Sequence, residues 1–346
     1  MRRSNLLRTI VGLLIAALFI YFAFRGISFK SLLHDALRAN YWILILTVLV
    51  VLLSHFFRAL RWRAILQELK SEISLIDTWG SIMVGYLFNN FVPRLGEIIR
   101  GYTTGRLERV SVSGVFGTIV LERLFDMLSS GILFGVALFL YHGSLVESFP
   151  FLRIAGIILV AGSVAVGGVL YAASISEKIQ KLTIRIITIM LPKKFAHKVE
   201  SILLSFLTSF RLLRSGKRVG IVSFYTAVIW LVYVFTMYVP FFAFPFGARL
   251  HLTFYDAFLL LLVTTIAWTL PTPGGMGVYH LLVSQALVVI SGVSKPEALT
   301  YATLTYFFGY IAITIVGSVF AFIFMRRLKI GSLRKLMKAA DESDGS

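Results

Sequence analysis

The chain has 346 residues, of which 58% are hydrophobic and only 14% carry a charge. Soluble domains are about half apolar and about a quarter charged, so this composition excludes an ordinary soluble enzyme. The formal charge is +18 and there is no cysteine, which excludes disulfides, zinc–thiolate sites and thiol catalysis. The basic residues form no nucleic-acid motif. We attribute them to cytoplasmic loops that touch anionic inner-leaflet lipids.

Apolar segments long enough to cross or enter a bilayer recur along the chain, and a spanning helix needs about 20 such residues. They lie at 6–24, 41–57, 76–92, 113–141, 151–172, 221–243, 256–270, 278–291 and 300–325. The first is interpreted as a retained helix and not a signal peptide, because no small-residue cleavage site follows it. Residues 1–328 are therefore predicted to form one transmembrane domain. Residues 329–346 are predicted to be a disordered cytoplasmic tail.

The distribution of Lys and Arg predicts which loops face the cytoplasm. Both termini and the loop 58–75 are basic and are placed inside. Segment 173–220 has ten Lys or Arg against two Glu, and its amphipathic pattern indicates helices lying on the inner leaflet. The alternative is that these helices only anchor and connect. Loop 142–150 has no Lys or Arg and is placed outside.

The number of crossings predicts two hairpins that enter the membrane without spanning it. An odd number of crossings must separate loops 58–75 and 142–150, yet two apolar segments lie between them. We therefore expect 76–112 to be a re-entrant hairpin from the inside, and 256–291 to be a second one from the outside. The expected fold is an all-α polytopic membrane protein. It has six full transmembrane helices plus two re-entrant helical hairpins of opposite sense, related by an inverted repeat.

Polar side chains gather at the tip of the first hairpin. They are Asn89, Asn90, Arg94, Glu97 and Arg100. An ionisable group inside a membrane is costly to bury and usually faces a partner or a cavity. Pro93 is suited to the first turn of a helix, whose positive N-terminal dipole could hold a lipid phosphate. The alternative is a simple ion pair of Glu97 with Arg100 at the inner interface, because the two share a helical face.

A second group lies inside segment 113–141. Glu122 and Asp126 are four residues apart on one helical face, with Arg123 between them. Two carboxylates this close repel unless a cation or a proton intervenes. The pattern therefore fits a proton or cation coupling site. It fits equally a structural lock between helices, in which Arg123 neutralises both carboxylates.

The third group is the tip of the second hairpin, 271–277. Gly274, Gly275 and Gly277 allow the backbone to approach a ligand or a helix closely. His280 follows at the start of the next helix and could carry a coupling proton near physiological pH. The alternative is a hydrogen-bonded histidine that only packs.

No motif for catalysis or nucleotide hydrolysis is present. The chain lacks Walker A, H-E-x-x-H, G-x-S-x-G and dinucleotide-binding sequences. We therefore expect no ATPase activity, no catalytic residue, no metal and no cofactor.

Three stretches resemble one known family. They are FNNFVPRLGEIIRGY (88–102), LERLFDM (121–127) and PTPGGMGVYH (271–280). In this order and spacing they resemble the lysylphosphatidylglycerol synthase transmembrane-region family, the flippase-like or UPF0104-type membrane proteins. The resemblance spans roughly 10–325. The family usually has a Glu shortly after the last tip glycine, where this chain has Tyr279 and His280. Relatives that synthesise lysylphosphatidylglycerol also carry a soluble C-terminal transferase domain, which we do not expect here.

The resemblance implies a flippase-like transporter of the cell (plasma) membrane that moves a phospholipid or polyprenyl-linked lipid between leaflets. Arg94, Arg100 and Arg123 would neutralise a lipid phosphate. Glu97, Glu122 and Asp126 would bind a cationic headgroup or carry coupling protons. Two other hypotheses remain open. The chain could be a non-transporting scaffold for an envelope or glycosylation pathway, or a membrane transferase acting on a lipid-linked substrate.

Overall fold

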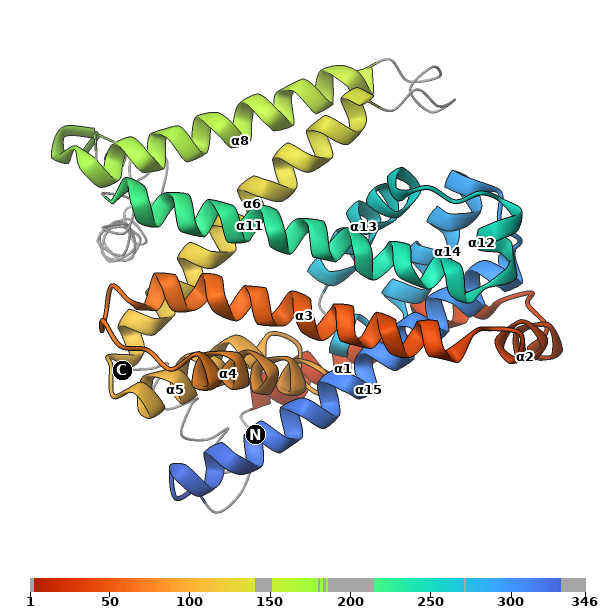
Figure 1. Cartoon of the computed structure of the whole chain (residues 1–346), viewed down its shortest axis with the longest axis horizontal. Coiled ribbons are helices and arrows are strands. Elements are labelled where there is room, and N and C mark those ends of the chain that lie inside the picture. Colours follow the sequence, from red (N-terminus) through yellow and green to blue (C-terminus); the bar gives the residue numbers. More distant parts are fainter. Residues whose placement is uncertain are drawn as a thin grey trace. The chain divides into compact units, whose positions relative to one another are not determined.

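A computed structural model describes residues 3–140, 151–179, 181, 182, 185, 215–270 and 272–330. Within these ranges every regular element is helical (Figure 1), as the long apolar segments predict. Loop 142–150, most of segment 173–220, Pro271 and the tail after residue 330 lie outside the described residues. The predictions made for those segments stay predictions.

The described helices are α1 (Arg3–Phe24), α2 (Phe29–Leu37), α3 (Tyr41–Leu66), α4 (Leu75–Asn89), α5 (Leu95–Glu108), α6 (Val112–Leu140), α8 (Phe151–Ile175), α11 (Gly216–Tyr238), α12 (Pro245–Arg249), α13 (Phe254–Thr269), α14 (Val278–Ser291) and α15 (Lys295–Arg327), with short 3-10 turns η2 (Val239–Ala243) and η3 (Pro273–Gly275). Each predicted apolar segment overlaps a described helix, and α2, α5 and α12 lie outside those segments.

The chain divides into two compact units. The first contains the described residues of Met1–Ala59, Ser74–Arg109 and Val228–Ser346, and the second those of Leu60–Ile73 and Val110–Ala227. The three polar groups found in the sequence are split between them. Both hairpin tips belong to the first unit, and the Glu122 group belongs to the second.

The first hairpin consists of α4 and α5. Ser74 caps α4 by accepting a hydrogen bond from the Asp77 backbone N–H at 3.2 Å. The two helices touch through glycines, because a Cβ added to Gly96 would lie only 1.9 Å from the carbonyl oxygen of Gly85. Small residues permit such close contact between apolar helices. This contact brings the two ends of the tip close together.

The second hairpin consists of α13 and α14. A capping box of Thr253 and Asp256 starts α13. Its tip turns sharply, since Gly274, Gly275 and Gly277 all have positive φ angles of 56°, 73° and 81°. Only glycine adopts such conformations without steric cost. The sequence Pro-Gly-Gly-Met-Gly is thus explained by the turn that it makes.

Helix α15 is the element against which both hairpins pack. It contacts α4 at two glycines: a Cβ on Gly80 would meet the Phe320 and Phe324 rings, and one on Gly317 would lie 2.7 Å from the Met83 carbonyl oxygen. Further apolar side chains of α4, α5 and α15 surround this contact. In the second unit, α6 and α8 make an equally close contact at Gly135 and Gly156.

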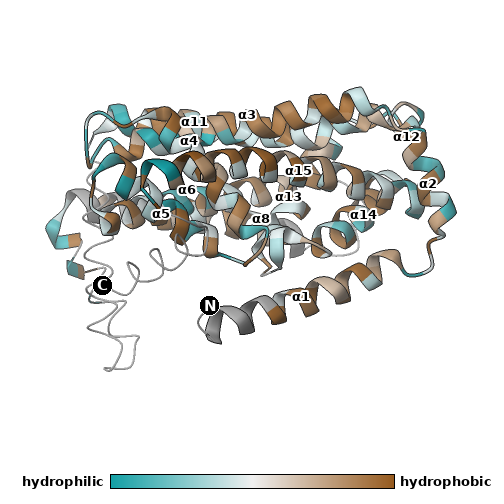
Figure 2. Ribbon diagram, turned by 90° about the horizontal axis from the view of Figure 1, so that it is seen from below, coloured by the Kyte–Doolittle hydropathy of each residue, from teal (hydrophilic) through white to brown (hydrophobic). Residues whose placement is uncertain are grey.

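Several helices have the length and hydropathy of membrane spans. Among the described residues four qualify: 41–66, 216–243, 273–291 and 295–327. A fifth is possible if α1 and α2, bent by 83° at their junction, count as one span. Hydrophobic residues predominate along α3 and α15 (Figure 2). The protein is therefore an all-helical membrane protein. The count of six spans and the re-entrant sense of the two hairpins stay predictions.

Two predicted helix boundaries differ from those in the structure. The predicted loop 58–75 is shorter, because α3 continues as a helix to Leu66. In addition, α5 begins at Leu95, two residues after Pro93, and its N-cap is Arg94 in a left-handed conformation with φ 64°. Basic residues at 58–63 suggested a loop, but they extend the helix beyond its apolar segment.

Candidate functional site

The two hairpin tips meet beside α15. Asn90 at the first tip donates a hydrogen bond from Nδ2 to Thr314 Oγ1 at 3.1 Å. At the second tip, Tyr306 donates from its hydroxyl to the Gly274 carbonyl oxygen at 3.0 Å. A Cβ on Gly274 would lie 2.9 Å from Asn90 Oδ1 and 3.2 Å from the Tyr310 ring. We call these five residues the tip junction.

A histidine and a tyrosine extend the tip junction along α14. The His280 ring lies 4.7 Å from the Tyr306 ring, measured between centroids, and the residue is 7% exposed. Tyr279 and Thr305 share a hydrogen bond of 3.2 Å between their hydroxyls. The buried atoms Nδ1 of His280 and Oγ1 of Thr272 have no hydrogen-bond partner among the described residues. Such atoms are costly to bury, and a ligand or water could satisfy them.

Helix α1 covers the end of this site. A Cβ on Gly277 would lie 2.4 Å from the Ala16 carbonyl oxygen and 3.1 Å from the Phe19 Cβ. The Phe24 ring, near the end of α1, lies 6.4 Å from the His280 ring. Gly277 therefore serves a close helix-to-tip contact, and any path to His280 from this side passes α1.

At the first tip the predicted residues have different environments. Asn89 accepts a hydrogen bond at Oδ1 from the Gly96 N–H at 2.7 Å, so its side chain caps α5. Arg94 is exposed, Glu97 is half-buried and Arg100 is buried. Of the five residues predicted at this tip, Asn90 is the one that joins the tip junction.

The carboxylates of α6 lie on an arginine from another helix. Arg61 Nη2 lies 3.2 Å from Glu122 Oε1 and 2.7 Å from Asp126 Oδ1. Arg61 also donates to Thr226 Oγ1 at 3.2 Å. Arg61 and Glu122 are fully buried, whereas the Asp126 side chain is 26% exposed. We call Arg61, Glu122 and Asp126 the buried triad.

Arg61 is a cation that the sequence interpretation of the second group did not include. Its Nη2 lies within ion-pair distance of both carboxylates, whereas Arg123, the neutralising residue in the hypothesis of a structural lock, is exposed. In the sequence, Arg61 is interpreted as part of the basic loop 58–75. The sequence signal that could have identified Arg61 is the neighbouring tryptophan, Trp62. In the structure Trp62 is fully buried and donates to Thr118 Oγ1 at 3.0 Å.

Sequence reasoning also missed the polar residues of α15 and of the α3–α4 contact. Tyr306, Tyr310 and Thr314 recur every four residues along α15 and so share one face. Between α3 and α4, buried Arg58 donates to the Tyr86 hydroxyl, and the His55 ring lies 4.4 Å from the Tyr86 ring. Within the described ranges no group of three or more His, Cys, Asp or Glu side chains could hold a metal ion.

The fold and these polar groups define a polytopic α-helical membrane protein with hydrogen-bonding groups inside its bundle. The family model of the lysylphosphatidylglycerol synthase transmembrane region matches residues 9–317. The chain therefore belongs to this family, which confirms the resemblance carried by its three motifs.

Known proteins of archaea are similar to the chain. A UPF0104 membrane protein of Pyrococcus horikoshii is 24% identical over 82% of this chain and 87% of its own length. A UPF0104 membrane protein of Methanocaldococcus jannaschii is 24% identical over 36% of this chain and 38% of its own. The glycosyltransferase AglD of Haloferax volcanii is 25% identical over 76% of this chain, which spans 45% of that protein. No solved structure matches the chain.

Proposed function

We propose that this protein moves a lipid, or the headgroup of a lipid-linked molecule, between the two leaflets of the cell membrane without hydrolysing ATP. The tip junction would be the place where the headgroup passes. The single observation that carries this proposal is the meeting of the two hairpin tips at Asn90 and Gly274, beside buried polar atoms for which the described part of the chain offers no hydrogen-bond partner.

The chemistry of the tip junction suits a transient ligand. Its contacts are neutral hydrogen bonds, each worth about 1 kcal/mol net. A phosphate or sugar hydroxyl could replace them at little cost, because the ligand would supply equivalent partners. Irregular backbone at membrane depth persists only where protein covers it or where it lines a wet cavity. Hairpins with such tips at the centre of a bundle are the arrangement that transporters use for binding sites.

The roles proposed for the charged residues differ by location. Arg94 is exposed at the first tip and would meet a lipid phosphate first. Arg100 and Glu97 lie deeper on α5. In the second unit, the 26% exposure of Asp126 makes it the member of the buried triad that could exchange a coupling proton, whereas fully buried Glu122 would stay paired with Arg61. His280 is the corresponding candidate in the first unit.

A lipid-translocation assay tests the proposal. The purified full chain is reconstituted into liposomes with a fluorescent phospholipid, and dithionite reports the fraction of label in the outer leaflet. We expect the wild type to move lipid. Asn90→Ala and Tyr306→Phe should each slow it about fivefold, which corresponds to roughly 1 kcal/mol of a lost hydrogen bond. Tyr21→Phe is the matched control, because Tyr21 is 58% exposed on α1.

The same preparation distinguishes the two other hypotheses. A transferase would convert an added lipid extract to a product of changed mass, and the name of the Haloferax volcanii relative makes a glycosyl donor the first to try. A scaffold would move no lipid and would tolerate Asn90→Ala in cells. Wild-type liposomes that move neither phospholipid nor polyprenyl-linked lipid would overturn the proposal.

The proposed topology, with both termini in the cytoplasm and both hairpins re-entrant, is tested separately. The chain has no cysteine, so single cysteines give no background. The exposed positions Glu72 and Arg109 flank the first hairpin, and Lys295 follows the second. An impermeant maleimide added to intact cells should label Lys295→Cys only. Labelling of Arg109→Cys but not Glu72→Cys would mean that the α4–α5 segment crosses the membrane once and does not re-enter.

A further inference from the structure

Helix α2 has an exposed apolar stripe that no other described element covers. Phe29, Leu33 and Leu37 recur every four residues and are 78%, 49% and 72% exposed. None of the helix's residues is buried. At 100° per residue these three positions occupy one sector of the helix about 80° wide. Isolated exposed apolar residues are ordinary, but an aligned row on a nine-residue helix indicates a surface that is covered in the working protein.

A basic stripe lies directly beside the apolar one. Lys30, His34 and Arg38 also recur every four residues, and each follows one member of the apolar stripe by one position. Their sector therefore borders the apolar sector on one side. The rest of the helix surface, formed by residues such as Ser31, Leu32 and Ala36, is half-buried and packs against α15. The helix thus has three faces: one that packs against α15, one that is apolar and exposed, and one that is basic.

The chain on both sides of α2 fixes where this helix can lie. It is bent by 83° from α1, so its axis runs nearly perpendicular to that apolar helix. After α2, the Asn40 N–H donates to the Ala243 carbonyl oxygen at 2.7 Å, and α3 begins at Tyr41. Trp42, at the start of α3, is 81% exposed. Exposed tryptophan at the end of an apolar helix is typical of the membrane–water interface.

We infer that α2 is an interfacial helix that lies in the plane of the membrane surface and binds anionic lipid. The bilayer itself covers the apolar stripe of the helix. Phe29, Leu33 and Leu37 insert among the upper acyl chains, while Lys30 and His34 reach the phosphates of neighbouring headgroups. A helix with an apolar stripe and a basic stripe side by side has this orientation in lipid. Basic side chains near a membrane surface are attracted to anionic lipid.

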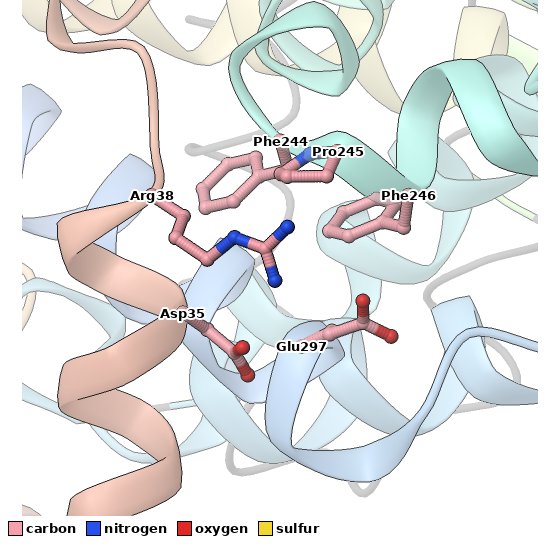
Figure 3. Close-up of a pocket in the computed structure, with 6 residues that line it drawn as sticks. All are labelled: Asp35, Arg38, Phe244, Pro245, Phe246 and Glu297. Carbon is pink, nitrogen blue, oxygen red and sulfur yellow. The ribbon is translucent and has the colours of Figure 1, made fainter.

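Arg38 connects this surface to the protein. Its guanidinium points toward the Phe244 and Phe246 rings, between the carboxyl groups of Asp35 and Glu297 (Figure 3). Glu297 is held in turn by Arg249, whose Nη2 lies 2.9 Å from Oε2. The end of α2 thus lies next to the start of α15. Lipid bound along α2 would therefore act on the helix against which both hairpin tips pack.

The test uses an environment-sensitive fluorophore on single cysteines in the full chain, reconstituted in liposomes. Leu33→Cys reports the apolar stripe and Lys30→Cys the basic stripe. Leu14→Cys on α1 serves as the acyl-chain control, since Leu14 is 65% exposed, and Glu72→Cys serves as the aqueous control. Quenching of the fluorophore by iodide measures its access to water. Quenching by nitroxides placed at the lipid headgroup or on the acyl chain measures its depth in the bilayer.

At Leu33→Cys we expect a blue-shifted emission, loss of iodide quenching and strongest quenching by the nitroxide high on the acyl chain. Lys30→Cys should be quenched best by the headgroup nitroxide. Adding an anionic phospholipid to zwitterionic vesicles should increase the quenching of the Leu33→Cys fluorophore by the acyl-chain nitroxide, because the helix then lies deeper. The added substitutions Lys30→Gln and His34→Gln should abolish this effect of anionic lipid.

Two results would overturn the inference. Iodide quenching of Leu33→Cys equal to that of Glu72→Cys would mean that the stripe faces water. Protection from iodide together with protection from both nitroxides would mean that protein covers the stripe, such as a second copy of this chain. Neither result depends on whether the protein translocates lipid.

Discussion

The tip junction and the buried triad are two polar groups inside an apolar protein, and they differ in charge. The tip junction is neutral, with hydrogen bonds of 3.0 and 3.1 Å that join Tyr306 to Gly274 and Asn90 to Thr314. The buried triad is ionic, with Arg61 2.7 and 3.2 Å from two carboxylates. Neutral hydrogen bonds can be exchanged for equivalent ones. A buried ion pair cannot lose one partner without leaving an uncompensated charge.

This contrast indicates which region can move and which must stay fixed. A site that passes a headgroup has to open and close, and the tip junction loses only about 1 kcal/mol per hydrogen bond when it does so. The buried triad connects the end of α3 to α6 and α11, and separating its charges would cost several kcal/mol. We therefore expect substitutions in the triad to affect folding, and substitutions in the junction to affect function.

The largest effect is expected from Arg61→Leu. This change leaves Glu122 buried without the cation that lies 3.2 Å from it, and the free energy of unfolding should fall by about 3–5 kcal/mol. Thermal unfolding in detergent, followed by tryptophan fluorescence, measures the loss. Arg123→Gln is the matched control, because that side chain is exposed on the same helix as Glu122. Equal losses in both variants would contradict the assignment of Arg61.

The next largest effect is expected at the glycine contact of the first hairpin. In Gly96→Ala the new methyl would lie 1.9 Å from the Gly85 carbonyl oxygen, so α4 and α5 must separate. Overpacking of this kind costs about 1–3 kcal/mol. The same substitution at Gly309 meets no atom within 4 Å and should change stability by less than about 1 kcal/mol. A stability of Gly96→Ala equal to that of Gly309→Ala would show that the contact is loose.

A smaller, pairwise effect is expected within the tip junction. Asn90→Ala and Thr314→Val each remove one partner of the 3.1 Å hydrogen bond. In a double-mutant cycle on unfolding free energy the coupling should be about 0.5–1.5 kcal/mol. Translocation, in contrast, should be slowed by either substitution. Strictly additive stability losses would indicate that the two side chains do not interact.

The smallest effect is expected at the exposed end of the first unit. Arg327 Nη2 donates to Asp77 Oδ2 at 2.9 Å, joining α15 to the start of α4. The Asp77 side chain is 7% exposed, but the arginine side chain is 48% exposed, so water can reach the pair from the arginine side. Exposed ion pairs contribute about 0–1 kcal/mol and are screened by salt. Arg327→Gln should therefore lower stability slightly at low salt and not at high salt. A salt-independent loss above that range would mean that the pair is shielded from solvent.

The sequence by itself determined the class of protein, the positions of its long apolar helices and the family, but not the short helices α2 and α12. Long apolar segments specify helices because a bilayer leaves backbone groups no other partner, and Pro273 with the glycines that follow it separates the apolar segments 256–270 and 278–291. Glycines with positive φ at 274, 275 and 277 follow from the same local chemistry. These features depend on neighbouring residues only, so they can be predicted from the chain.

The tertiary structure alone decided which polar residues meet. Asn90 and Thr314 are 224 residues apart in sequence, and Arg61 and Glu122 are 61 apart. No local pattern links them, and Arg61 was assigned to a loop because basic residues usually mark one. Their pairing depends on how apolar helices pack through glycines such as Gly85, Gly96 and Gly317. The partner of a polar residue is thus decided by the packing of the helices around it. The pattern of hydropathy along the chain does not specify that packing.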